Sequence, residues 1–272
     1  MIDYSAFDEK KLVKYAGKLP GLPKLTSPTT VMVYAGIVAF LFIGPFVYST
    51  GGRLVSMMIL MSAVLYGSYA FTMKGQEQSI RTALFASRNK FGYSWKGGRY
   101  KQLTGLGSIM GEPMKSNVIT GHFMGQPFTI SGVYGERILK NVMRVELPNK
   151  YPHIVLDSKQ GDIIPNSLKT VFPSNKEIVL EGNFPDYFRV YTATTPVETL
   201  QILSPELMER MIKYSHRADI EIIENQLFLI GNYRLQGKED YQMMFTAVEQ
   251  ILKDIGVNTN NSKVKFDSVS RI

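Results

Sequence analysis

The side chains best suited to chemistry are three histidines, His122, His153 and His216. Histidine can bind a metal or act as a general acid or base near neutral pH. These three are separated by at least 31 residues, and none has a second ligand at the short spacing typical of a metal site. We therefore predict that each lies in a strand or at a helix end, and we predict no metal site.

Two carboxylates, Asp157 and Asp162, bracket the sequence SKQG. They could form an acid and base pair only if the fold closed a pocket around them, and a solvated loop is the preferred interpretation. The absence of cysteine excludes thiolate catalysis. The segment TGLGSIMGE, residues 104–112, lacks the Gly-Lys-Ser/Thr of a phosphate loop and is predicted to be a linker. The sequence thus indicates no catalytic residue and no cofactor.

Two long apolar runs predict a transmembrane helical hairpin over residues 31–73. Residues 31–49 and 54–73 contain no charged side chain. At 1.5 Å per residue, each is long enough to cross about 30 Å of hydrocarbon. The first run starts too far along the chain and is too long for a signal peptide, so we expect the hairpin to remain in the mature protein. A polar turn separates the runs and contains Gly51, Gly52 and Arg53.

The excess positive charge lies beside these runs and not in the remainder of the chain. The net charge of +8 divides into +2 over residues 1–30, +1 at Arg53, +6 over residues 74–101 and −1 over residues 102–272. A nucleic-acid-binding module would carry its basic face in the folded domain, so no nucleic acid partner is predicted. Because lysine and arginine favour the cytoplasmic side, both termini are expected in the cytoplasm of a bacterial inner membrane, with the hairpin as a multi-pass anchor.

Basic and aromatic side chains flank the hairpin on both sides. Residues 1–30 are predicted to form a basic amphipathic segment along the headgroups or, alternatively, a partly disordered terminus. Residues 74–117 are predicted to be a basic, aromatic juxtamembrane segment followed by a glycine-rich linker. The side chains expected at the membrane interface are Lys10, Lys11, Lys14, Lys18, Lys74, Arg81, Arg88, Lys90, Trp95, Lys96, Arg99 and Lys101.

From residue 118 the pattern changes to short β-branched runs separated by turn residues, which is typical of an antiparallel sheet. Met124 and Gly125 separate the first two runs and predict a hairpin, and a second hairpin is predicted about Asn225. The predicted strands cover 118–123, 126–134, 141–147, 153–157, 176–181 and 187–192.

Two amphipathic helices are predicted in the second half of this region. The first starts after the N-cap candidate Ser204, with Pro205 at its first position. The second follows Gly237 and ends at Gly256, a suitable C-cap. The fold class is therefore α+β: a soluble domain over residues 118–256 with helices on one face of the sheet, followed by a flexible tail at 257–272.

The run GNFPDYFRVYTATTPVETLQILSPELMERM, residues 182–211, followed by ADIEIIENQLFLI, resembles an uncharacterised family of bacterial membrane-anchored proteins. The resemblance covers about residues 115–255. It implies two N-terminal spans and a C-terminal α+β domain, together with a bacterial membrane location. That family has no assigned reaction, so the resemblance implies no catalytic residue.

These features favour a non-enzymatic membrane protein whose cytoplasmic domain binds a protein partner or organises a complex. Its predicted partners are the lipid bilayer and an unidentified protein, and a homo-oligomer of the same chain is left open. Two alternatives stay open: a membrane-bound hydrolase whose site is assembled from distant segments, and a module that senses anionic lipid through the basic segments.

Overall fold

The computed structural model describes residues 1–10, 12–15, 18–19, 77–99, 114–135, 138–160, 176–180, 182–231 and 237–256. Several predictions fall outside these residues: the spans 31–49 and 54–73 with their turn, the segment 104–112, Asp162 and the tail from 257. Within the described ranges, no helix combines the length and the apolar character that a membrane crossing needs. The described part is a mixed α/β structure with an antiparallel sheet, as the sequence predicted for the soluble domain.

Within the described residues, the sheet has seven strands in the order β1-β2-β3-β4-β6-β5, and β7 pairs with β4. Each of the six pairings is antiparallel. The strands are β1 (Gly92–Arg99), β2 (Met114–Phe123), β3 (Gln126–Gly135), β4 (Ile138–Ser158), β5 (Lys176–Ile178), β6 (Phe188–Thr192) and β7 (Ala218–Gly231).

The first predicted hairpin is confirmed between β2 and β3. Phe123 pairs with Gln126 across the two-residue turn. Both turn residues have positive φ, 53° at Met124 and 79° at Gly125. Two successive positive φ values match the right-handed twist of the flanking strands, and glycine adopts this conformation without steric cost.

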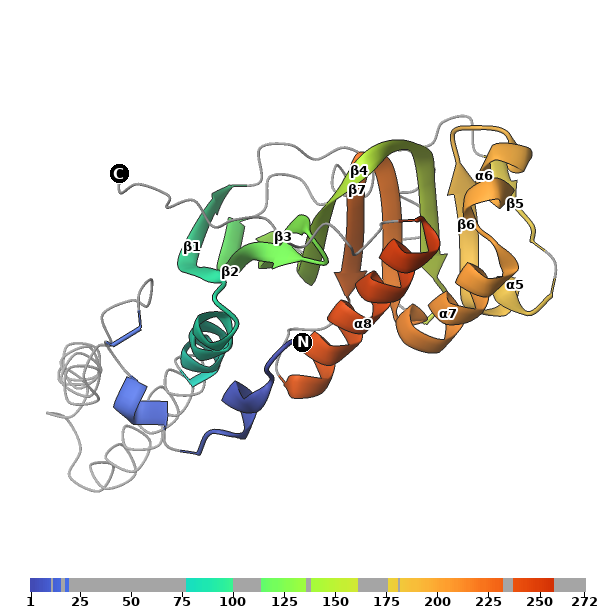
Figure 1. The fold of residues 1–272 in the computed structure, drawn as a ribbon. Coiled ribbons are helices and arrows are strands. Elements are labelled where there is room, and N and C mark those ends of the chain that lie inside the picture. Colours follow the sequence, from blue (N-terminus) through green and yellow to red (C-terminus); the bar gives the residue numbers. More distant parts are fainter. Residues whose placement is uncertain are drawn as a thin grey trace, which may run out of the picture.

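The central strands form a nested arrangement that the sequence did not predict. The runs 141–147 and 153–157 both lie in β4, which bends into an arch with register shifts between Glu146 and Ile154. Strand β7 also turns back, at Glu224 where φ is 50°, and its two arms lie between the two arms of β4 (Figure 1). This places both ends of β7 beside the start of β4, and Asn141, Arg217 and Gly231 line one small cavity of about 20 Å³.

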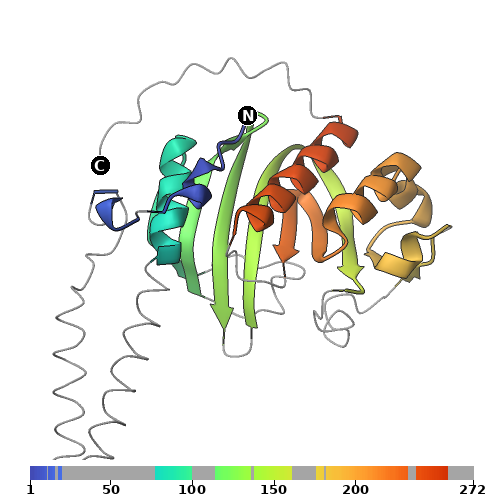
Figure 2. The same cartoon turned by 90° about the horizontal axis from the view of Figure 1, so that it is seen from below.

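The helices lie together on one face of the sheet, as predicted (Figure 2). Ser204 caps α7, because its Oγ accepts a hydrogen bond from the Leu207 amide at 3.1 Å. Thr195 forms a capping box with Glu198 at the start of α6, and Gly256 follows α8 with φ of 78°. The helices are one over residues 77–88, α5 (Phe184–Tyr187), α6 (Pro196–Ile202), α7 (Pro205–Ser215) and α8 (Lys238–Asp254).

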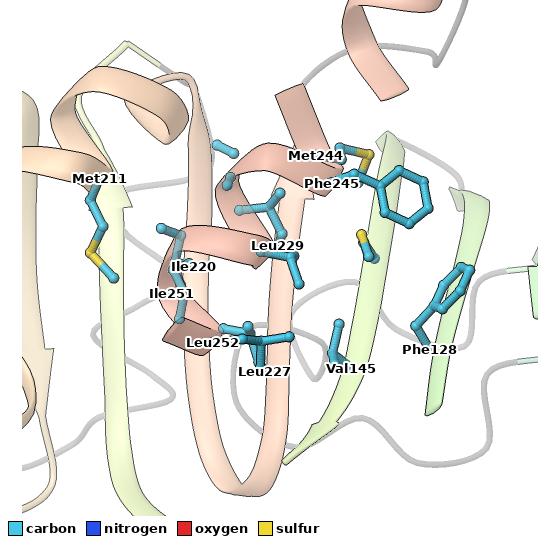
Figure 3. Close-up of a cluster of buried hydrophobic side chains, with 14 of the residues drawn as sticks. Phe128, Val145, Met211, Ile220, Leu227, Leu229, Met244, Phe245, Ile251 and Leu252 are labelled. Carbon is cyan, nitrogen blue, oxygen red and sulfur yellow. The ribbon is translucent and has the colours of Figure 1, made fainter. Parts of the chain in front are cut away.

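The hydrophobic core lies between this helical layer and the sheet (Figure 3). The residues of α8 at helical spacing point at the strands, and the Phe245 ring packs edge-on against Phe128 with centroids 5.4 Å apart. Met211 of α7 and Met244 of α8 are each 2% exposed, so both are core residues. Burying side chains of this size supplies most of the stability of such a layered domain.

The domain begins before the predicted boundary at residue 118. The helix over residues 77–88 contributes Leu84, Phe85 and Ala86 to the core, and β1 is an edge strand paired with β2. The basic and aromatic composition of residues 74–101 led to a juxtamembrane interpretation, but its described part, 77–99, is integral to the fold. In the sequence, the apolar side chains of this helix are interrupted by polar residues and by the arginines Arg81 and Arg88, which hid its core-facing side.

Candidate functional site

The N-terminal residues pack on the domain as two short 3₁₀ turns, η1 (Ser5–Asp8) and η2 (Leu12–Tyr15). We call the described part of residues 1–19 the N-terminal clasp. Ala6 is fully buried and Leu12 is 6% exposed. The sequence left open an amphipathic helix or a disordered terminus here, and the structure instead shows a segment seated against the helix over residues 77–88.

Hydrogen bonds between the clasp backbone and the side chains of Asn89 and Arg81 fix the direction of the clasp along this helix. The Asp3 amide donates to Asn89 Oδ1 at 2.7 Å, and Asn89 Nδ2 donates back to the Asp3 carbonyl at 2.8 Å. Further along, Arg81 Nη1 donates to the Phe7 carbonyl at 2.7 Å. Residue 3 thus lies at the end of the helix and residue 7 nearer its start, so the two segments run antiparallel.

Two arginines predicted to face the membrane take part in this docking. Arg81 also forms an ion pair with Glu77 at 2.8 Å. Arg88 donates to Ser5 Oγ at 2.6 Å and lies 3.6 Å from the Glu9 carboxylate. Their side chains are about one quarter exposed, at 22% and 26%. Both therefore have intramolecular partners that hold the clasp in place.

An aromatic cluster centred on Phe85 completes the docking. The rings of Tyr4 and Phe7 lie 5.8 and 5.5 Å from the Phe85 ring, which lies 4.8 Å from the Tyr241 ring of α8. Burial raises the pKa of Tyr4 and of Tyr241, each to about 12. Both phenols therefore stay neutral, which suits rings packed in an apolar cluster.

The other predicted interface residues are distributed unevenly over the described part. Lys10, Lys18, Lys90 and Lys96 are exposed, and Trp95 is half-buried in β1. Arg99 occupies the last position of β1, and Lys14 lies in η2. The residues outside the described ranges are Lys11, Lys74, Lys101, Gly51, Gly52 and Arg53.

Three buried carboxylates, Asp157, Asp219 and Glu221, lie on the sheet face opposite the helices. We call them the acidic row. Glu221 is paired in register with Val155, and Asp157 with Arg189 of β6. Continuing the β4–β7 register by one residue brings Asp219 opposite Asp157. The three residues are between 1% and 5% exposed, so the predicted solvated loop at Asp157 was wrong.

Burial perturbs the titration of Asp157 and Asp219. Burial raises the pKa of Asp157 to about 6, although the Arg189 guanidinium opposes the shift. Burial raises the pKa of Asp219 well above its usual range, and the nearby Asp157 charge adds to the shift. The hydrogen bond from the Ser158 amide to Oδ1 and the Lys140 charge oppose it. The buried Oδ2 of Asp219 has no hydrogen-bond partner among the described residues.

Sequence reasoning missed this row because acidic residues alternate with apolar ones in ADIEIIE, a pattern normally typical of a strand with one solvated face. Asp219 and Glu221 are nevertheless buried, on the face of the sheet that the helices do not cover. The acidic row is closed to solvent in this structure, so its measurable effect is on stability.

The histidines lie where the sequence placed them. His122 is in β2, His153 is in β4, and His216 caps the C-terminus of α7. His153 Nε2 contacts Glu221 Oε1 at 2.6 Å, and His216 Nδ1 contacts the Ile212 carbonyl at 2.8 Å. Among the described residues, no three side chains of the metal-binding types are grouped so that they could hold an ion.

Comparison with known proteins shows a likeness of fold. No protein-family model matches the chain, and no curated protein matches it. The chain is similar to a solved structure, the crystal structure of the mycobacterial trehalose monomycolate transport factor A, TtfA, with a TM-score of 0.52 and 13% sequence identity. The match covers 66% of this chain and 95% of that one. At 13% identity, the likeness shows a shared fold alone.

Proposed function

We propose that this protein is a bacterial inner-membrane protein whose helical hairpin anchors a non-catalytic α+β domain in the cytoplasm, where the domain binds a protein partner. The observation that carries the anchoring is the clasp. Asp3, Ser5 and Phe7 are hydrogen-bonded to Asn89, Arg88 and Arg81, so residues that precede and follow the apolar runs in the sequence lie together on one domain.

This adjacency restricts the topology of any membrane crossing between those points. A single crossing would put residues 1–19 and 77–91 on opposite sides of about 30 Å of hydrocarbon, which would break every contact of the clasp. Two crossings return the chain to the same side. The two apolar runs at 31–49 and 54–73 meet this requirement, and the basic flanks favour the cytoplasm as that side.

Cysteine labelling tests the anchoring, because the chain has no native cysteine. We expect Gly51→Cys to react with a membrane-impermeant maleimide in intact cells. Lys10→Cys and Lys213→Cys should react only after permeabilisation, since both side chains are exposed on the domain side. Labelling of only one of residues 10 and 213 in intact cells would contradict the two-span hairpin. Labelling of both in intact cells would place the domain outside the cytoplasm.

Exposed apolar side chains on α6 support the partner-binding part of the proposal. Val197 is 66% exposed and Leu200 is 47% exposed. Residues three apart on a helix are neighbours on its surface, so these two form one apolar spot beside the edge of the sheet. Val179, which follows the edge strand β5, is 82% exposed. Grouped apolar exposure of this kind is typical of contact surfaces.

Site-specific photocrosslinking tests this surface in cells. A photoreactive residue at Leu200 is expected to yield a discrete crosslinked species, whereas one at Glu209, exposed on α7, should not. The crosslink should be lost when Val197→Asp is added, because a charge in the apolar spot opposes burial. Equal crosslinking from both positions, or none from position 200, would argue against α6 as the contact.

A further inference from the structure

We propose that the surface between the helix over residues 77–88 and α8 is a recognition groove for an acidic, aromatic segment of a partner protein, and that the N-terminal clasp is its intramolecular ligand. The partner segment docks by displacing the clasp. This inference goes beyond the proposed function, because it requires neither the membrane anchor nor the apolar spot on α6. We call this surface the clasp groove; it consists of Arg81, Phe85, Arg88, Asn89, Lys238 and Tyr241.

Two helices that lie far apart in the sequence form the walls of the clasp groove. The Phe85 and Tyr241 rings lie 4.8 Å apart, and the Tyr241 hydroxyl donates to Thr82 Oγ1 at 3.4 Å. Lys238, the first residue of α8, contacts Asp8 of the clasp at 3.1 Å. In both Figure 1 and Figure 2 the turn η1, drawn in blue, lies between these two helices. The clasp is therefore seated against both walls.

The groove holds the clasp by its backbone. Asn89 is bonded to both the amide and the carbonyl of Asp3, at 2.7 and 2.8 Å. Arg81 Nη1 donates to the carbonyls of Phe7 and Glu9, at 2.7 and 3.2 Å. In peptide recognition, main-chain hydrogen bonds of this kind give affinity, and the surroundings of the side chains give specificity. A segment of another protein can therefore use the same backbone contacts.

The packing of the clasp defines the apolar part of the pattern that the groove selects. The Tyr4 and Phe7 rings lie 5.8 and 5.5 Å from the Phe85 ring, and the Phe7 ring lies 5.1 Å from the Tyr241 ring. Ala6 is fully buried, so a larger side chain there would have to displace its neighbours. The groove thus fits two aromatic residues three positions apart, with a small residue directly before the second.

The charges of the groove define the polar part of the pattern. Two carboxylates directly follow the second ring of the clasp, and each meets a cation on a different wall. Asp8 lies 3.1 Å from Lys238 of α8, and Glu9 lies 3.6 Å from Arg88 of the other helix. Complementary charge of this kind favours an acidic segment and opposes a basic one.

Acidic residues on the same two helices are engaged with other groups. Glu77 is paired with Arg81 at 2.8 Å, and Glu249 with Lys253 at 2.6 Å. Asp240 accepts a hydrogen bond from the backbone amide before α8. The acids of the walls therefore leave the cations that meet the clasp carboxylates in place.

The contacts of the clasp suit a segment that can be displaced. Asp3, Ser5 and Asp8 are exposed, and Tyr4 and Phe7 are only half-buried. The hydrogen bonds at Asp3 also lie at exposed positions. Segments with few buried apolar side chains and with exposed hydrogen bonds open locally at a low free energy. A competing segment binds the open form, so its apparent affinity depends on the fraction of chains in which the clasp is open.

Binding of a peptide in trans tests the clasp groove. The probe is a fluorescein-labelled peptide of residues 1–10, and the receptor is the full-length chain in detergent. In wild type the clasp competes at an effective concentration of about a millimolar, so little peptide should bind. In Tyr4→Ala/Phe7→Ala, which weakens the clasp, we expect fluorescence anisotropy to give an apparent Kd about tenfold lower than in wild type. Adding Asn89→Ala to this clasp variant should remove the gain.

The matched control is Tyr187→Ala/Tyr214→Ala, which removes two half-buried rings from α5 and α7. It should bind as little peptide as wild type, and a peptide with both of its rings replaced by alanine should bind none of the chains. If a melting curve shows that the clasp variant is unfolded, Asp8→Lys/Glu9→Lys provides the same comparison through charge.

Two results would overturn the inference. No gain in a folded clasp variant, or an equal gain in the control, would mean that the clasp is only a structural part of the domain. A wild-type chain that is dimeric by light scattering, and becomes monomeric in the clasp variant, would assign the groove to the clasp of a second copy and not to a partner protein.

Discussion

Replacing Phe85 by alanine is expected to lower the free energy of unfolding by about 3–5 kcal/mol, the usual cost of truncating a buried phenylalanine. Phe85 is fully buried, and its ring contacts the clasp residues Tyr4 and Phe7 as well as Tyr241. The cavity would therefore weaken both the core and the clasp. Urea unfolding of the full-length chain in detergent, followed by Trp95 fluorescence, measures the change.

The specific consequence for the clasp is faster trypsin cleavage after Lys10, which is exposed but flanked by residues held against the domain. Phe123→Ala is the control, because Phe123 contacts Phe245 and not the clasp. It should destabilise the domain without a selective increase at Lys10. Equal cleavage at Lys10 in wild type and Phe85→Ala would show that the clasp does not depend on this ring.

Raising the pH is expected to destabilise the domain through the acidic row. The pKa of Asp157 is raised in the folded chain from 3.8 to about 6, and the pKa of Asp219 is raised well above 3.8. A group with a raised pKa contributes stability that is complete below its unfolded pKa and is lost as the pH passes its folded pKa. Stability from Asp157 should therefore fall between about pH 4 and pH 7, and that from Asp219 at higher pH.

Removing the carboxylate charges tests whether Asp157 and Asp219 cause this loss of stability at higher pH. In wild type, the urea midpoint of unfolding should fall from pH 5 to pH 8. Asp219→Asn and Asp157→Asn should each make this fall smaller, and the double variant should make it smaller still. Glu177→Gln is the control, since Glu177 is exposed on β5 and raises the pKa of Asp157 less than burial does. A pH profile unchanged in Asp219→Asn would mean that this carboxyl is ionised, or compensated, in the folded protein.

Local features of the fold were predictable because they depend on residues close together in the chain. The N-cap at Ser204, the turn at Met124 and Gly125, and the C-cap at Gly256 follow from hydrogen-bonding and conformational preferences of single residues. The apolar stripe of α8 follows from helical periodicity.

The start of the domain was not predictable in this way. The basic side chains of residues 77–99 obscured the core positions Leu84 and Phe85, and only the packing of the helix on the sheet identifies them.

The clasp was missed because its partners Asn89 and Tyr241 are separated from Asp3 and Phe7 by more than 80 residues. Composition and periodicity describe residues that are close in the chain, so they do not predict which distant helix a terminal segment will contact.

By itself, the sequence determined the class of this protein: two apolar runs with basic flanks, then an antiparallel sheet with amphipathic helices on one face. Composition, periodicity and capping are short-range properties and can be read along the chain. Only the tertiary structure decided that β7 nests inside the arch of β4 and that Asp219 and Glu221 are buried. Such pairings join residues up to 90 positions apart. They depend on the sum of many weak contacts, which no local pattern records.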